Sequence, residues 1–136
     1  MNRLPAKIAA VDVHGSIALV DAAVDAHRFT AMLIGAADEV KNWTTGMPVT
    51  LLFKETEVSL AKNLSGLLSM RNRIPCTVTA VEHGKLLTKV SLNFNGNLIE
   101  SIITTRSSHA LSIAPGDIVE GLVKANEMTV IAEDAT

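Results

Sequence analysis

The side chains best suited to chemistry in this chain are basic and hydroxyl groups, and the chemistry they suit is the binding of a small anion. Arg71 lies directly before a predicted strand, Lys54 and Lys124 lie at strand ends, and Thr104 and Ser107 lie where a strand ends and a short helix begins. A few cations and backbone N–H groups can hold an anion, and the N–H groups at a helix start attract one. Plainer roles are open to the same residues, as solvated strand-end cations and as a helix cap.

Signatures of catalysis and of metal binding do not appear in the sequence. It has no nucleophile elbow, no phosphate loop and no paired carboxylates in a pocket pattern, so an enzyme is not expected. The four histidines share no spacing and have no cysteine companion, which argues against a zinc or copper site. The single cysteine, Cys76, cannot form an internal disulfide, and its repeat counterpart Ala6 favours a small packed residue there.

Composition narrows the class of protein. With 48% hydrophobic and 19% charged residues among 136, the chain is not disordered, and no apolar run reaches the roughly 20 residues of a membrane helix. Its opening, MNRLPAKIAAVDVHG, lacks the continuous apolar core of a secretory signal. A net charge of −2 and 3% aromatic residues argue against a nucleic-acid partner. We therefore expect a soluble protein in the reducing cytoplasm, with no membrane partner.

An internal repeat organises the chain. Sliding the sequence against itself by 70 positions gives a gap-free match, most visible where MNRLP at the start recurs as RNRIP at 71–75. One offset held along a whole chain rarely arises by chance, so we interpret the chain as two copies of one module, about 1–61 and 71–132, joined by KNLSGLLSM. The identical pairs are Asn2/Asn72, Arg3/Arg73, Pro5/Pro75, Ala10/Ala80, Val11/Val81, Val20/Val90, Gly46/Gly116, Val49/Val119, Leu52/Leu122, Lys54/Lys124 and Glu57/Glu127.

The second copy shows most clearly which elements position these residues. Alternate residues from 86 to 94 face one side of a strand, Asn95-Gly96 is a strong hairpin turn, and a second strand covers 98–104. Ser107 and Ser108 can cap a short helix through residue 111. The residues APGD at 114–117 are typical of a turn. We expect TVTAV to form the first strand of this copy, and IVEGLVK and EMTVIA to form its last two.

Five short strands with a small helix after the third follow the plan of the oligonucleotide/oligosaccharide-binding (OB) fold. The predicted fold is all-β, with two tandem five-stranded OB barrels, residues 1–64 and 65–136, each with a short helix. Barrels of about 60 residues have thin cores, so tandem copies and oligomers are the natural way to stabilise them.

Several separated motifs of the second copy resemble the Mop (molbindin) domain of the TOBE group. Residues 69–72, Ser-Met-Arg-Asn, resemble its Ser-Ala-Arg-Asn signature, while APGD at 114–117 and LVKANEM at 122–128 resemble its later turn and its Lys-Ala-Ser-Glu-Val segment. The motifs recur more weakly in the first copy, so the whole chain resembles a di-domain molbindin. The resemblance implies OB-fold proteins that bind molybdate or tungstate in the cytoplasm, with tandem forms assembling as trimers of hexamer-like symmetry.

The resemblance also implies which residues bind the oxyanion. Donors come from the Ser-Ala-Arg and Lys-x-Ser segments of one module, and from a threonine and a serine after the third strand of a neighbour. Asn126 replaces the usual serine, and its amide can still donate. The implied site residues of the second copy are Ser69, Met70, Arg71, Lys124, Asn126, Thr104 and Ser107, with no protein ligand to the metal itself.

The first copy keeps fewer of these residues. Lys54 and Thr56 survive, but Met1, Ile34 and Ala37 occupy three of the other positions, and no residue precedes Met1 to match the signature serine. We therefore expect fewer working sites than a symmetric pseudo-hexamer could hold. A single site could combine Lys54 and Thr56 from one copy with the threonine and serine of another.

The predicted function is therefore molybdate or tungstate binding in the cytoplasm, for storage, buffering or homeostasis, by a homotrimer with sites at module interfaces. Two alternatives stay open. One is a ligand-sensing module that acts on a separate regulator or transporter, because the chain has no helix-turn-helix and no ATPase segment of its own. The other is a structural OB assembly without ligand, if the departures at Asn126, Ile34 and Ala37 are disabling.

Overall fold

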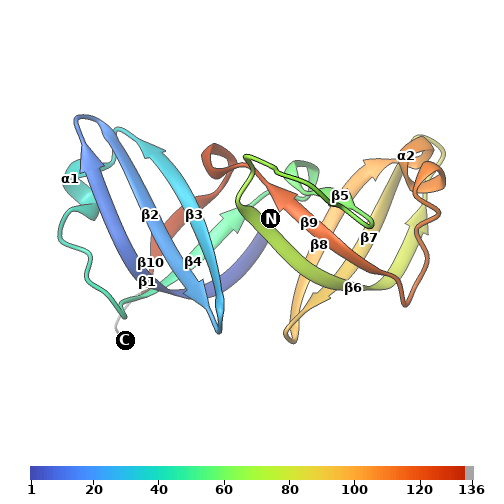
Figure 1. Ribbon diagram of the computed structural model, residues 1–136, viewed down its shortest axis with the longest axis horizontal. Coiled ribbons are helices and arrows are strands. Elements are labelled where there is room, and N and C mark those ends of the chain that lie inside the picture. The colour runs from blue at the N-terminus through green and yellow to red at the C-terminus, as the bar shows by residue number, and fades with distance from the viewer. Residues whose placement is uncertain (134–136) are drawn as a thin grey trace.

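The computed structural model describes residues 1–133 and consists of two five-stranded antiparallel sheets that lie side by side (Figure 1). The predicted all-β class is confirmed. The first half contains β1 (Asn2–His14), β2 (Ile17–Val24), β3 (His27–Ile34), α1 (Ala37–Val40), β4 (Pro48–Phe53), the 3-10 turn η1 (Glu55–Glu57) and β5 (Ser59–Ala61). The second half repeats this order with β6 (Asn72–His83), β7 (Leu87–Phe94), β8 (Asn97–Thr104), α2 (Thr105–Ala110), β9 (Ile118–Val123), η2 (Ala125–Glu127) and β10 (Thr129–Ala132).

Alternating side chains build each strand and its half of the core. Along β7, every second residue from Thr88 to Phe94 is buried, as the sequence pattern predicts for a strand with one face on the core. The turn after it places Asn95 and Gly96 at φ values of 50° and 85°, the conformation that favours an Asn-Gly pair in a tight hairpin. The phenylalanines Phe29, Phe53 and Phe94 are among the largest fully buried side chains.

The long strands β1 and β6 each pair with two neighbouring strands, and each contains a β-bulge where its pairing shifts. In β1 the pairing shifts between Ile8 and Ala10, so its first part pairs with β4 and its last part with β2. In β6 the shift lies between Val78 and Ala80, 70 positions later, with β9 and β7 as partners. A bulge bends and twists a strand, which lets each sheet curl towards a barrel.

The two halves exchange their last strands. The first sheet has the order β10-β4-β1-β2-β3, and the second has the order β5-β9-β6-β7-β8. The strand β10, at the end of the chain, therefore lies beside β4 in the first sheet, and β5 lies beside β9 in the second (Figure 1). Each sheet consequently takes four strands from one half and one from the other, which a simple tandem arrangement does not anticipate.

Two buried asparagines tie the halves together. The Asn2 amide donates to the backbone carbonyl of Glu100 and accepts from its N–H, both at 2.8 Å. The Asn72 amide makes the same two bonds to Thr30, also at 2.8 Å. Because Thr30 and Glu100 are 70 positions apart, these asparagine bridges are related by the internal repeat.

The short helix α2 begins earlier than the sequence predicts. Its cap is Thr104, whose side chain accepts a hydrogen bond from the N–H of Ser107 at 3.0 Å. The expectation that Ser107 and Ser108 cap the helix was therefore wrong, because the threonine that ends β8 already supplies the capping oxygen. Within residues 1–133 the α-helices have four and six residues, and none is long and apolar enough to cross a membrane.

Candidate oxyanion-binding site

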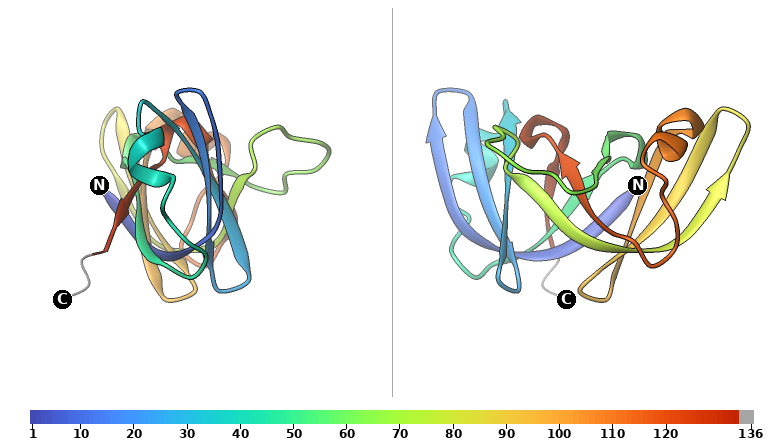
Figure 2. Two further views of the ribbon diagram at one scale, coloured as in Figure 1. Left: turned by 90° about the vertical axis from the view of Figure 1, so that its left-hand side faces the viewer. Right: turned by 45° about the vertical axis from the view of Figure 1, so that its right-hand side comes forward.

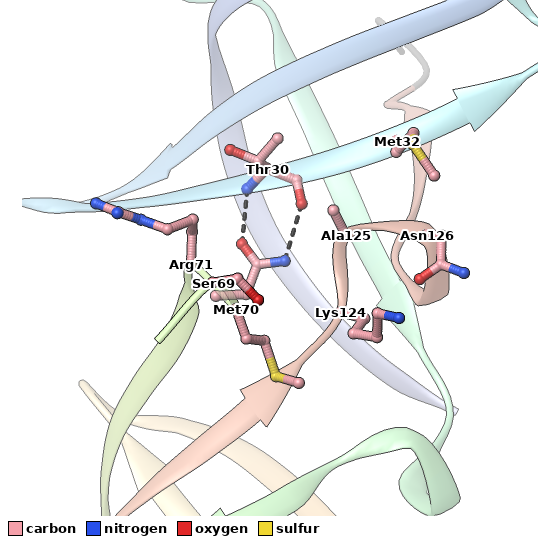
Figure 3. A pocket seen from close by; sticks show the side chains of 9 residues that line it. Thr30, Met32, Ser69, Met70, Arg71, Lys124, Ala125 and Asn126 are labelled. Carbon is pink, nitrogen blue, oxygen red and sulfur yellow. Dashed lines mark hydrogen bonds between the residues drawn. The ribbon is translucent and has the colours of Figure 1, made fainter. Parts of the chain in front are cut away.

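A pocket of about 350 Å³ lies between the two halves of the chain. One wall comes from β3 of the first half, and the other comes from the segment before β6 and from the η2 turn of the second half (Figure 3). Its lining residues are Thr30, Met32, Ser69, Met70, Arg71, Asn72, Lys124, Ala125 and Asn126. Five of the nine residues predicted from the sequence therefore meet in one place.

Local structure explains how these side chains reach the pocket. The linker between the halves, residues 62–70, projects from the body before it turns into β6 (Figure 2). The N–H of Arg73 bonds the carbonyl of Arg71 at 3.0 Å, which fixes the turn that leads into the strand. On the opposite side, Lys124 is the extended residue between β9 and η2, and the N–H of Glu127 bonds its carbonyl at 3.0 Å. Both turns hold their side chains at the rim of the pocket.

The lining of the pocket includes two cationic residues, Arg71 and Lys124. None of its nine described lining residues is acidic, and neither Arg71 nor Lys124 forms an ion pair with any residue from 1 to 133. Both cations are exposed, and in Figure 3 the guanidinium of Arg71 extends away from Lys124. Two cations without a carboxylate partner leave a site open to a negatively charged ligand.

The neighbouring Arg73 has a structural role. Its guanidinium makes two hydrogen bonds to the carboxylate of Glu120, at 2.6 and 2.7 Å, between β6 and β9. The side-chain hydrogen bond from Arg73 lowers the pKa of Glu120 and raises the pKa of Arg73 itself. A paired arginine of this kind stabilises the sheet and is not free to bind a ligand.

Thr104 and Ser107 lie elsewhere in the chain. They flank the start of α2, at the far end of the second half (Figure 1), where the Thr104 hydroxyl also donates to the Ser107 hydroxyl at 2.7 Å. Thr104 lines a separate hollow of about 590 Å³ together with Arg106 and His109. Within one chain, these two hydroxyls are therefore not part of the pocket at Lys124.

Lys54 and Thr56 occupy a third place, on and beside the η1 turn. This turn packs on β8 as η2 packs on β3, so Lys54 is the repeat counterpart of Lys124 in space as well as in sequence. Glu55 follows Lys54 in the chain, and its carboxylate accepts a hydrogen bond from the N-terminal ammonium. That hydrogen bond lowers the pKa of Glu55, so the carboxylate stays charged at neutral pH.

Sequence reasoning missed four lining residues: Thr30, Met32, Asn72 and Ala125. Thr30 and Met32 come from the opposite half, and no feature of their own sequence marks them. Asn72 did carry a signal, because it is identical to Asn2 across the repeat although an asparagine inside a strand is unfavourable. Its amide bridge to Thr30 explains the identity and also links the two walls of the pocket.

No group of three or more histidine, cysteine, aspartate or glutamate side chains within the described residues is arranged to hold a metal ion. His83 and His109 do stack, with ring centroids 5.3 Å apart, but parallel rings face each other with their π surfaces. The cations and amides at the Lys124 pocket suit an anion.

Comparisons with known proteins agree with this architecture. Residues 68–130, in the second half of the chain, match the family model of the TOBE domain. The whole chain has the fold of the cytoplasmic molybdate-binding protein ModG in a crystal structure with molybdate bound, with a TM-score of 0.90, 24% identity, and 97% of this chain and 96% of that chain covered. The predicted OB-type fold is therefore confirmed.

The sequence relatives of the chain include molybdenum import proteins. The chain is 38% identical over 80 residues to the molybdenum import ATP-binding protein ModC of Brucella abortus (strain 2308), and equally to that of Brucella suis biovar 1 (strain 1330). These matches cover 58% of this chain but 22% of ModC. The chain thus spans about a fifth of the length of these relatives.

Proposed function

We propose that the protein is a di-domain molbindin that binds molybdate or tungstate, for storage, buffering or homeostasis in the cytoplasm. The observation that carries the proposal is the pocket itself, where Ser69, Arg71, Lys124 and Asn126 meet without a carboxylate. A tetrahedral dianion loses its water shell on binding, so the site must supply charge and directed donors. Support also comes from the fold shared with ModG and from the TOBE match.

A single chain supplies only part of the proposed coordination. At about 30 Å³ for each water, a pocket of about 350 Å³ has the volume of roughly twelve waters, more than one five-atom oxyanion fills. The remaining donors that we propose, Thr104 and Ser107, lie at the other end of the second half. We therefore propose that another copy of the chain brings them to the Lys124 pocket, within a homotrimer.

The proposed function is binding, not catalysis. ModG is described as a molybdate-binding protein, and the pocket offers cations and amides in place of a nucleophile and base. The sensing and ligand-free alternatives are not favoured, since nothing in the pocket is specific to either. As modules of the sequence we keep 1–64 and 65–136, although the exchanged strands β5 and β10 mean that each sheet includes residues from both modules.

Isothermal titration of the purified oligomer with molybdate, tungstate and sulfate tests the proposal, with the oligomer mass measured on the same sample. We expect molybdate to bind more tightly than sulfate, which has the same charge but shorter bonds to oxygen. Lys124→Ala removes one charge-assisted hydrogen bond, worth about 1.5–3 kcal/mol, and should weaken binding about tenfold to hundredfold. Unchanged affinity in this variant would remove Lys124 from the site, and no binding of either metal oxyanion would contradict the proposal.

A further inference from the structure

The turn at Lys124 has a counterpart 70 positions earlier in the chain. We name the two places by their lysines: the Lys124 cradle is formed by Asn72, Lys124, Ala125 and Asn126, and the Lys54 cradle by Asn2, Lys54, Glu55 and Thr56. Their backbones agree, with φ and ψ of −67° and 147° at Lys124 and −76° and 150° at Lys54. Their asparagine bridges also agree, with all four hydrogen bonds at 2.8 Å.

Burial is the same in both cradles. The order of buried, half-buried and exposed positions from 51 to 59 is repeated without change from 121 to 129, so each residue of one turn has the setting of its counterpart. Ala125 and Glu55 are thus equivalent, half-buried positions. The two turns therefore share their backbone course and their burial and differ in their side chains.

The difference that matters for an anion is charge. Ala125 lines the Lys124 pocket, where Arg71 and Lys124 are both without a carboxylate partner among residues 1–133. In the Lys54 cradle, Glu55 occupies the position of Ala125. Its carboxylate forms an ion pair with the N-terminal ammonium of Met1, and Met1 is the repeat counterpart of Arg71. Glu55 therefore cancels a positive charge where the other cradle keeps two.

A second acidic residue near the Lys54 cradle is turned elsewhere. Glu100 is the counterpart of Thr30, but its carboxylate lies 3.5 Å from the ammonium of Lys89 on β7. Its backbone, not its side chain, meets Asn2. Glu57 carries a further carboxylate, which accepts a hydrogen bond from the N–H of Lys54 at 3.0 Å, but its repeat counterpart Glu127 is identical. Glu55 is therefore the acidic residue that distinguishes the two cradles.

We propose that the carboxylate of Glu55 keeps tetrahedral oxyanions out of the Lys54 cradle, so that the chain binds them through the Lys124 cradle alone. This inference rests on the proposed function and assigns Glu55 as the residue that determines which of two similar cradles works. A dianion approaching Glu55 is repelled by a like charge in a partly buried setting, where screening by solvent is weaker than in water. The repeat thus supplies two copies of one backbone and only one binding site of this kind.

Substitutions that change charge but not size test the inference by isothermal titration of the full-length oligomer with molybdate. Glu55→Gln should bind one more molybdate per chain than wild type, and adding Lys54→Ala to that variant should remove the extra binding. In the other cradle, Ala125→Glu should bind molybdate at least tenfold more weakly than its size-matched control Ala125→Gln. Circular dichroism and oligomer mass should be the same in all variants.

The titrations of these variants either support the role of Glu55 or overturn it. The inference is overturned if Glu55→Gln binds the wild-type number of molybdate ions, or if Ala125→Glu binds as tightly as Ala125→Gln. It is also overturned if the extra ion in Glu55→Gln survives the loss of Lys54. Wild-type protein that binds no molybdate would overturn the proposed function and this inference with it, so the two failures are distinguishable.

Discussion

Replacing Asn72 or Asn2 with alanine should destabilise the whole protein, because each asparagine bridges the two halves. Each amide makes two hydrogen bonds of 2.8 Å to the backbone of the opposite half, and the two residues are 1% and 5% exposed. A hydrogen bond contributes about 1 kcal/mol net, and leaving a buried partner unpaired costs about 1–3 kcal/mol. For two bonds, we expect the free energy of unfolding to fall by about 2–4 kcal/mol in each variant.

Urea unfolding followed by circular dichroism measures this loss. Asn126→Ala is the matched control for stability, because Asn126 is exposed and its side chain makes no hydrogen bond within residues 1–133. It should change the free energy of unfolding by less than about 0.5 kcal/mol. Asn72→Asp adds a sharper comparison, since a carboxylate can accept from the N–H of Thr30 but cannot donate to its carbonyl. If both alanine variants unfold like the control, water replaces the bridges and the reasoning is refuted.

Three further predictions follow from other contacts. Ending the chain at Met128 removes β10, and hydrogen exchange should then quicken in β4, in the opposite half of the sequence, because β4 loses one of its two partner strands and keeps only β1. Faster exchange confined to β9 would contradict the exchanged pairing. Because the folded-state pKa of Glu120 lies below its ordinary 4.5, its pairing stabilises the protein above pH 4.5 and this stability is lost as the pH falls through the lower value; Glu120→Gln should flatten that acid limb in urea unfolding. Burial raises the pKa of the Cys76 thiol to about 12, so at pH 8 its thiolate fraction is roughly a thousandfold lower than that of a thiol at 9.0, and thiol reagents should label it only after unfolding.

The sequence predicts much of the architecture because its signals are local. Alternation along β7, the Asn95-Gly96 turn and the offset of 70 all follow from residue types that restrict the backbone or the burial of one face. The cations at Arg71 and Lys124 were also identifiable, since they stand within motifs that resemble a known domain. Both residues line the same pocket in the structure, and the motifs alone had already assigned both to one site.

The exchange of strands could not be predicted in the same way. Thr129 on β10 pairs with Leu52 on β4, and Ser59 on β5 pairs with Leu122 on β9. Leu52 and Leu122 are identical across the repeat, so each terminal strand meets an equivalent partner whether it stays in its own half or crosses to the other. Hydrophobic alternation sets which face of a strand is buried, not which of two similar edges it joins.

The exchange explains why the pocket forms where the halves meet. The chain leaves the second sheet at Val123, the end of β9, and enters the first sheet at Thr129, the start of β10. Residues 124–128 must span this crossing, and they include Lys124 and the η2 turn that packs against β3. Lys124 is therefore held between two sheets by covalent connection on both sides, and Asn72 fastens the same two sheets a short distance away. An anion bound at Lys124 would contact both halves, so its binding should also stabilise the exchanged arrangement against unfolding.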